Sequence, residues 1–345
     1  MITIGHYFFL FLATYAFVGF LTPLLRQFAI SKEILDHPNS DHKSHLNPIP
    51  YLGGVAIILG VVVITYVAII FSNLSKNNFW LATSLIMPAL AMGIIGLWDD
   101  IKNLHPFPRF IGQTISGIVV AILLIISNNF GNPTGSIMID VFITVFWIVG
   151  ICNSINFFDN LDGGAAGTTA VSSIAITYLA ITNNQSLIGA LSIVVAGACL
   201  GFLIWNRSPA RIYMGDAGAL FLGVLIATLT IRLKPDTETS IASFSTPVLL
   251  LAVPILDTSV AVISRFQRKV SPFQGGKDHL SHRLIRMGIS RKTTALLLWI
   301  LSCFFASLAI IINSSFPIHE YFIVIFATSI WIFLLILFLN SKGMH

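Results

Sequence analysis

The chain has 345 residues, of which 56% are apolar and only 10% are charged, and its formal net charge is +5. Its mean hydropathy of +0.88 lies far above that of soluble globular proteins, so we expect a polytopic membrane protein of the all-α class. No nucleic acid partner is expected, because no soluble domain is left to bind one. The cysteines lie in apolar stretches without metal-ligand or disulfide spacing: Cys152, Cys199 and Cys303.

About 20 mostly apolar residues are needed to cross the hydrocarbon core of a bilayer as a helix. By this measure we expect about eleven spans, near residues 5–26, 51–71, 80–98, 110–127, 135–157, 165–183, 186–205, 217–233, 241–264, 292–313 and 318–340. The fifth to eighth of them are short enough to merge or re-enter the membrane. The whole chain, residues 1–345, is predicted to form one integral membrane domain.

The basic residues follow a parity along the chain. Of the 19 Lys and Arg residues, all but Lys76, Arg232 and Lys234 lie at the end of the first span, in every second link or in the C-terminal tail. If the link after each span is given the number of that span, these are the odd-numbered links. The positive-inside rule places the odd links in the cytoplasm, with the N-terminus outside and the C-terminus inside. We therefore expect a multi-pass protein of the plasma membrane with its active site on cytoplasmic loops.

Each of the first two odd links contains a short motif that indicates a possible functional role. In the second, Asp99 and Asp100 directly follow an apolar span, and adjacent carboxylates at a membrane boundary repel each other unless a cation or protons compensate. This favours a functional role, although a solvated helix end with basic neighbours is the alternative. Gly53-Gly54, at the entrance of a span, indicates either close helix packing or a backbone that must stay small beside a substrate.

The next two odd links add a polar series and an acidic residue. Asn153, Asn156, Asp159 and Asp162 recur every third residue, so neighbouring members share a helix face and could converge on one ligand. A capping residue with a glycine turn is the alternative for Asp162 only. Asp216 is either the N-cap of the following span or a ligand to Mg²⁺, a cation usually held by one or two carboxylates together with substrate phosphates.

The last long link contains two histidines. His279 and His282, flanked by Arg and Lys, form a donor cluster suited to phosphate, and a solvated basic loop is the alternative. Zinc is weakly supported, because no Cys or His-Glu-x-x-His pattern accompanies them. Asp257, within the ninth expected span, is a charge at membrane depth, where such residues are functional or paired with a neighbouring helix.

Taken in order, these links resemble the polyprenyl-phosphate N-acetylhexosamine-1-phosphate transferases, the family that also contains phospho-N-acetylmuramoyl-pentapeptide transferase. The resemblance covers residues from about 36 to 285. It rests on a Pro-x-x-Gly-Gly entrance, the Asp-Asp pair, an Asn-x-x-Asn-x-x-Asp-x-x-Asp-Gly segment, a Gly-Asp-Ala-Gly run and the histidine cluster. It implies transfer of a sugar-1-phosphate from a UDP-amino sugar to polyprenyl phosphate with release of UMP, supported by Mg²⁺ or Mn²⁺, as the first membrane step of cell-envelope polysaccharide synthesis.

The resemblance also implies roles for individual residues. The metal ligands would be Asp216, supported by Asp99. The catalytic groups would be Asp99, Asp100, Asp159, Asp162 and His279. The substrate would be held by Lys43, His45, Lys102, Arg109, Asn153, Asn156, Asn206, His282 and Arg283.

The chain departs from the family pattern at three of these links. Ser281 stands where a histidine is expected, and Asn160 stands where glycine is common. Gly164 stands where leucine is common, and Ala219 stands where serine often follows the Asp-x-Gly run. The longer histidine run of the pentapeptide transferases is absent, which favours UDP-N-acetylglucosamine over UDP-N-acetylmuramoyl-pentapeptide. UDP-N-acetylgalactosamine stays open, as does a homodimer. The rival class is a nucleotide-sugar transporter, which would place coupling residues near the bilayer midplane on broken helices, where only Asp257 is found.

Overall fold

A computed structural model of the chain describes residues 3–36, 48–71, 76–102, 104–271, 276–314 and 316–341. This part is almost entirely helical, as the composition predicts. The elements are α1 (Ile4–Ser31), β1 (Leu35–Asp36), β2 (Ile49–Pro50), α2 (Gly53–Phe71), α3 (Lys76–Lys102), α4 (Pro106–Ser127), α5 (Ile137–Phe158), α6 (Gly164–Thr182), α7 (Ser186–Asn206), α8 (Gly215–Arg232), α9 (Ser240–Leu250), α10 (Ala252–Gln267), α11 (Leu280–Arg286), α12 (Arg291–Ile312) and α13 (Pro317–Asn340). The two strands pair antiparallel.

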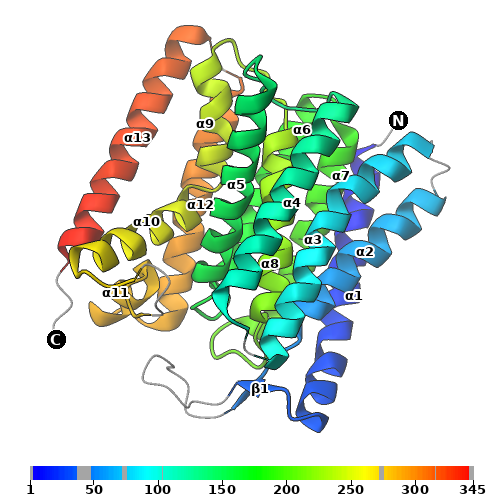
Figure 1. The fold of residues 1–345 in the computed structure, drawn as a ribbon, viewed down its shortest axis with the longest axis vertical. Helices are drawn as coiled ribbons and strands as arrows, with labels where there is room; N and C mark the ends of the chain where they lie inside the picture. The colour runs from blue at the N-terminus through cyan, green and yellow to red at the C-terminus, as the bar shows by residue number, and fades with distance from the viewer. Residues whose placement is uncertain are drawn as a thin grey trace.

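The number of membrane crossings agrees with the expectation of about eleven. Within the described residues, ten helices are long and apolar enough to span a membrane, and the bent pair of α9 and α10 raises the number to eleven. The start of α1 and the end of α13 lie toward opposite ends of the bundle, as an odd number of crossings requires (Figure 1). The fifth to eighth spans neither merge nor re-enter, because α5, α6, α7 and α8 are separate full-length helices.

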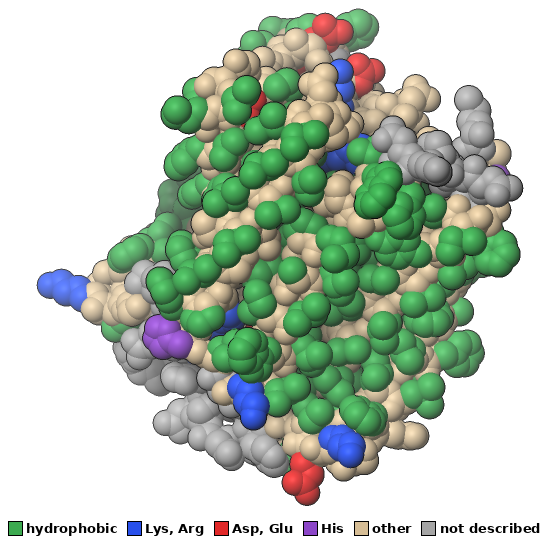
Figure 2. Space-filling model, turned by 45° about the vertical axis from the view of Figure 1, so that its right-hand side comes forward, with side chains coloured by type: hydrophobic (Ala, Val, Ile, Leu, Met, Phe, Trp, Pro, Cys, Tyr) green, Lys and Arg blue, Asp and Glu red, His purple; other side chains and the backbone are tan. Residues whose placement is uncertain are grey.

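The surface of the bundle is apolar where lipid would contact it. Figure 2 shows hydrophobic side chains over the middle of one face, with most of the charged side chains toward its upper and lower ends. Large side chains such as Phe20 on α1 and Phe322 on α13 are mostly exposed. Because contiguous apolar patches of this extent are not stable in water, this surface indicates contact with the acyl chains of a bilayer.

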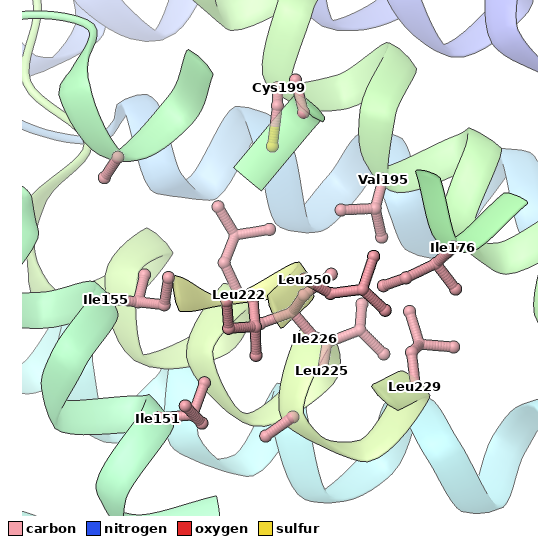
Figure 3. Close-up of a cluster of buried hydrophobic side chains, with 14 of the residues drawn as sticks. Ile151, Ile155, Ile176, Val195, Cys199, Leu222, Leu225, Ile226, Leu229 and Leu250 are labelled. Atoms are coloured by element: carbon pink, nitrogen blue, oxygen red, sulfur yellow. The ribbon is translucent and has the colours of Figure 1, made fainter. Parts of the chain in front are cut away.

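Helix α8 lies at the centre of the bundle. Its side chains Leu222, Leu225 and Leu229 pack among residues of the surrounding helices, including Ile151 and Ile155 of α5 (Figure 3). It has its most extensive contacts with α3 and is buried along nearly its whole length. A helix packed on all sides to this density cannot shift without moving its neighbours, so the start of α8 is a rigid support for the residues that it carries.

The ninth expected span, residues 241–264, is a bent pair of helices rather than one continuous helix. Helix α9 ends at Leu250 and α10 begins at Ala252, with a bend of 75° between them. The 11 residues of α9 cover about 16 Å, roughly half of the hydrocarbon core. Helix α10 carries Asp257 and Arg265, both buried in protein and too costly to present to lipid. It therefore turns aside and packs on α5 and α13, near the end of the bundle that holds the C-terminus (Figure 1).

Candidate active site

A cavity of about 530 Å³ lies where the ends of many helices meet. Its lining comes from β1, the ends of α3, α5 and α7, the starts of α4, α8, α11 and α12, and the links between them. In the described part of the chain two arginines line it, Arg109 and Arg291. Six carboxylates face them: Asp36, Asp99, Asp100, Asp159, Asp162 and Asp216. Negative charge therefore exceeds positive charge among these residues.

Arg109 lies between two of these carboxylates. Its Nη1 atom is 2.7 Å from Asp99 Oδ2 and 2.8 Å from Asp216 Oδ2. Only the contact with Asp216 has hydrogen-bond geometry, and Asp99 Oδ2 is buried without a hydrogen bond. Asp99 and Asp216 thus bracket a single cation position, which the guanidinium group fills in this structure.

Asp216 does not cap its own helix. The N-cap of α8 is Met214, and the Asp216 carboxylate instead accepts hydrogen bonds from Arg109 and, at 2.5 Å, from Asn156 Nδ2. The alternative that Asp216 is simply an N-cap is therefore wrong. Asp100, from the end of α3, supplies the missing cap: its two oxygens accept the backbone N–H groups of Asp216 at 2.8 Å and Ala217 at 3.0 Å. A negative charge at this position is favoured by the helix dipole.

The turn that leads into α8 requires glycine. Gly215 has φ = +71°, a left-handed conformation that side chains with a Cβ rarely adopt. A Cβ atom at this position would also lie 2.6 Å from Asp100 Oδ2 and 2.9 Å from its Cγ. The absence of a side chain at Gly215 thus allows Asp100 to reach the start of α8.

The polar series after α5 converges only in part. Asn156, Asp159 and Asp162 line the cavity, whereas Asn153 faces α4, where its amide pairs with Gln113. The alternative role of Asp162 as a helix cap is wrong, because Gly163 is the N-cap of α6. Asp162 Oδ2 instead accepts a hydrogen bond from the backbone N–H of Ala210, at 3.2 Å.

Asn206 and Asp159 have distinct environments in the same region. Asn206 lines the cavity, but its amide is engaged with backbone: Oδ1 accepts the N–H of Gly163 at 2.9 Å, and Nδ2 donates to the carbonyl of Ile212 at 3.0 Å. It therefore joins two links that line the cavity. Burial, and then the neighbouring carboxylates of Asp216 and Asp100, raise the pKa of Asp159 well above its ordinary value.

The two histidines of the last link both line the cavity. Burial, followed by the proximity of His279, lowers the pKa of His282 to about 4. At neutral pH the imidazole of His282 is therefore uncharged and can donate a hydrogen bond to a phosphate without adding positive charge. Arg291, at the start of α12, adds a positive charge to the lining of the cavity.

Some residues expected at the site lie elsewhere. Lys102 is exposed at the end of α3 and does not line the cavity. Arg283 is buried and donates to the backbone carbonyls of Asp278 and Phe338, so it anchors α11 to the end of α13. Lys43 and His45 lie outside the described residues.

Other residues at the cavity were not expected there from the sequence. Asp36, Tyr51, Tyr213 and Arg291 line it, and of these four only Tyr51 lies within a motif, the Pro-x-x-Gly-Gly entrance. Asp36 lies in β1, and Arg291 lies beyond the histidine cluster. Aromatic and basic residues such as Tyr213 and Arg291 are common at membrane interfaces, so only their position in the fold distinguishes them.

The donor set at Asp99 and Asp216 fits a hard divalent cation. Within the described residues no three His, Cys, Asp or Glu side chains form a metal-binding group. Mg²⁺, however, is commonly held by one or two carboxylates, with substrate phosphates and water completing its shell. The buried Asp99 Oδ2, which has no hydrogen bond, and the excess of carboxylates both suit such a cation.

Comparison with known proteins agrees with this site. The model of glycosyl transferase family 4 matches residues 82–234, which run from within α3 to just beyond the end of α8. The chain is 32% identical over 324 residues to a probable undecaprenyl-phosphate N-acetylglucosaminyl 1-phosphate transferase of Bacillus subtilis, covering 92% of this chain and 85% of that protein.

Two further relatives carry related names. A decaprenyl-phosphate N-acetylglucosaminephosphotransferase of Mycobacterium leprae is 30% identical over 309 residues, covering 81% of this chain and 77% of the relative. A phospho-N-acetylmuramoyl-pentapeptide-transferase of Staphylococcus carnosus is 29% identical over 282 residues, covering 76% and 86%. Together with the order of the polar links around the cavity, these similarities establish that the chain belongs to glycosyl transferase family 4, the polyprenyl-phosphate sugar-1-phosphate transferases.

Proposed function

We propose that this protein transfers N-acetylglucosamine-1-phosphate from UDP-N-acetylglucosamine to a polyprenyl phosphate, releasing UMP and forming a polyprenyl-diphosphate sugar. The observation that carries the proposal is the pair of carboxylates, Asp99 and Asp216, that brackets one cation position inside an acidic cavity. Both substrates are anionic, so their phosphates can enter this cavity only with cations. Family membership supplies the reaction class.

In the proposed reaction, a phosphate oxygen of the lipid attacks the β-phosphorus of the UDP-sugar. The bond from that phosphorus to the oxygen bridging to the α-phosphate breaks, and this oxygen leaves with UMP. A phosphate monoester has a second pKa near 6 and is largely dianionic at neutral pH, so the attack needs no general base. The carboxylates of the cavity are then free to orient groups rather than to remove protons.

Different residues of the cavity have different roles in this reaction. Asp99 and Asp216 would hold Mg²⁺, or Mn²⁺, which would neutralise charge on the diphosphate and the departing UMP. Arg109, which contacts both carboxylates, would be free to hold a phosphate oxygen if a metal took its place between them, and a guanidinium is well suited to that contact. Asp100 fixes the start of α8 and thereby the place of Asp216. Positioned charge of this kind is commonly the largest catalytic contribution.

We propose that Asn160 and Ser281 influence the choice of sugar. The Ser281 hydroxyl donates to Asn160 Oδ1, and Asn160 lines the cavity beside Asp159. These two departures from the family pattern therefore touch each other. Ser281 is only 1% exposed, so a histidine at this position would have to displace its neighbours. This small, neutral pair supports a simple N-acetylhexosamine over a peptide-bearing substrate.

The purified protein is expected to release UMP when both UDP-N-acetylglucosamine and undecaprenyl phosphate are present with Mg²⁺. Omitting the lipid phosphate, or removing the metal with EDTA, should abolish release, and added Mg²⁺ should restore it. Nucleotide products are separated by chromatography, in parallel with UDP-N-acetylgalactosamine and UDP-N-acetylmuramoyl-pentapeptide. Release of UDP in place of UMP, or release that needs no lipid, would contradict the proposal.

We also place the cavity on the cytoplasmic side of the plasma membrane, where UDP-sugars are made. The support is the excess of basic residues in the odd links. In a variant with Cys303 changed to serine, Lys234→Cys is expected to react with a membrane-impermeant maleimide in intact cells. Lys277→Cys, exposed at the cavity end, should react only after permeabilisation. The reverse labelling pattern would show that the orientation is inverted.

A further inference from the structure

Asp257 is a buried carboxylate that has no role in the reaction described above. It lies on α10 with 0% of its surface exposed. Its two carboxylate oxygens contact two consecutive residues, His279 and Leu280. Oδ2 is 2.7 Å from Nδ1 of His279, and Oδ1 accepts the backbone N–H of Leu280 at 2.7 Å. His279 lines the cavity and Asp257 does not, so the Asp257 side chain is connected to the cavity through this imidazole.

A second residue of α10 holds the other side of the ring. Arg265 Nη2 is 3.3 Å from Nε2 of His279, and Arg265 follows Asp257 by about two helical turns on the same helix. Arg265 Nε donates in turn to Asp278 Oδ2 at 3.1 Å. The edge of the imidazole also contacts the ring of Phe157, with 5.9 Å between ring centroids. The His279 ring is thus clamped between two residues of α10.

The hydrogen-bonding partners define the tautomer of the neutral ring. A guanidinium has only donors, so Nε2 must accept from Arg265 and cannot carry the proton. Nδ1 then carries it and donates to Asp257, which as a carboxylate can only accept. Replacing the acceptor Asp257 by a hydrogen-bond donor, or the donor Arg265 by an acceptor, would favour the other tautomer of His279 or rotate its ring.

We propose that Asp257 is a positioning residue for the transfer reaction: it fixes the tautomer and orientation of His279 in the cavity and seats the start of α11. This inference rests on the proposed function.

The decisive variant is Asp257→Asn, which keeps the size of the side chain. Whichever way its amide is turned, its NH₂ group faces either the N–H of His279 or the N–H of Leu280, so one donor meets another. We expect kcat/KM to fall about 10- to 100-fold, as when a partner that orients a functional imidazole is removed. In a His279→Ala background the same change should cost less than about twofold, because Asp257 acts through His279.

A matched control separates positioning from stability. Glu320 on α13 is also 0% exposed, and it accepts the backbone N–H groups of Glu238 and Thr239 before the start of a short helix, α9. Glu320→Gln should lower the thermal unfolding midpoint about as much as Asp257→Asn but leave kcat/KM within about twofold of the wild type. Equal losses of activity in the two variants would overturn the proposal, as would additive losses in the double variant Asp257→Asn/His279→Ala.

A spectroscopic readout makes the test independent of catalysis. In protein labelled with ¹⁵N-histidine, the ring nitrogens of His279 should report an Nδ1–H tautomer, assigned by loss of its signals in His279→Ala. Asp257→Asn should abolish or reverse that pattern, and an unchanged pattern would overturn the proposal. If the wild type releases no UMP while the tautomer still depends on Asp257, the proposed function fails and the positioning role stands.

Discussion

Replacing Asp216 by asparagine is expected to lower kcat/KM by on the order of 10³-fold or more, with the fold intact. Asparagine preserves the size of the side chain and can still accept from Asn156 Nδ2. It removes one of the two charges that bracket the cation position, however, and so releases Arg109 and weakens any divalent cation held there. The rate of UMP release at saturating Mg²⁺ measures the effect.

Asp140→Asn is the control for this experiment. Asp140 is likewise a mostly buried carboxylate, but it lies at the other end of α5. Its Oδ1 accepts from the N–H and the hydroxyl of Thr134, both at 2.8 Å, and an asparagine oxygen can do the same. Its activity should stay within about twofold of the wild type. Equal activity of Asp216→Asn and Asp140→Asn would remove Asp216 from the proposed site.

Replacing Gly215 by alanine is expected to reduce kcat/KM by about 10²-fold, although no atom of the reaction is changed. The new Cβ would lie 2.6 Å from Asp100 Oδ2, and Asp100 cannot yield without losing the two N–H groups at the start of α8. Asp216, in that same turn, would move with them. Displacements of about 1 Å at a catalytic group commonly cost this much.

Gly135→Ala is the control that separates the clash with Asp100 from the strain of placing alanine in a left-handed conformation. Gly135 has φ = +85°, similar to the +71° of Gly215, but nothing lies within 4 Å of where its Cβ would be. Both variants should lose about 1–2 kcal/mol of stability from the left-handed conformation. Only Gly215→Ala should lose activity, and equal turnover in the two, measured at matched folded fraction, would contradict the role given to the contact between Gly215 and Asp100.

The sequence was sufficient to predict the fold class and the places of most helices. Runs of about 20 apolar residues have no alternative to a membrane-spanning helix, because lipid offers no partner for backbone polar groups. The ninth span was the exception, since an apolar run does not reveal whether a helix continues or bends. Pro247 and Pro254 flank the bend at Leu251, but proline is also tolerated within straight membrane helices.

At the candidate site, the sequence could predict which residues carry charge but not which of them meet. Asp99 and Asp100 are adjacent in the chain, yet one faces Arg109 and the other caps α8. This division depends on the placement of α8, which local spacing does not determine. Asp257 shows the same limit, because its partner His279 lies 22 residues away on another element.

The fate of the β-phosphate tests the central claim most directly. Purified protein is incubated with undecaprenyl phosphate, Mg²⁺ and UDP-N-acetylglucosamine that carries ³²P in the β-phosphate, and the lipid is extracted into organic solvent. Transfer of a sugar-1-phosphate predicts that the label moves into the lipid in step with UMP release, and that Asp216→Asn prevents both. Label that remains in the aqueous phase as UDP while the sugar enters the lipid would contradict the account.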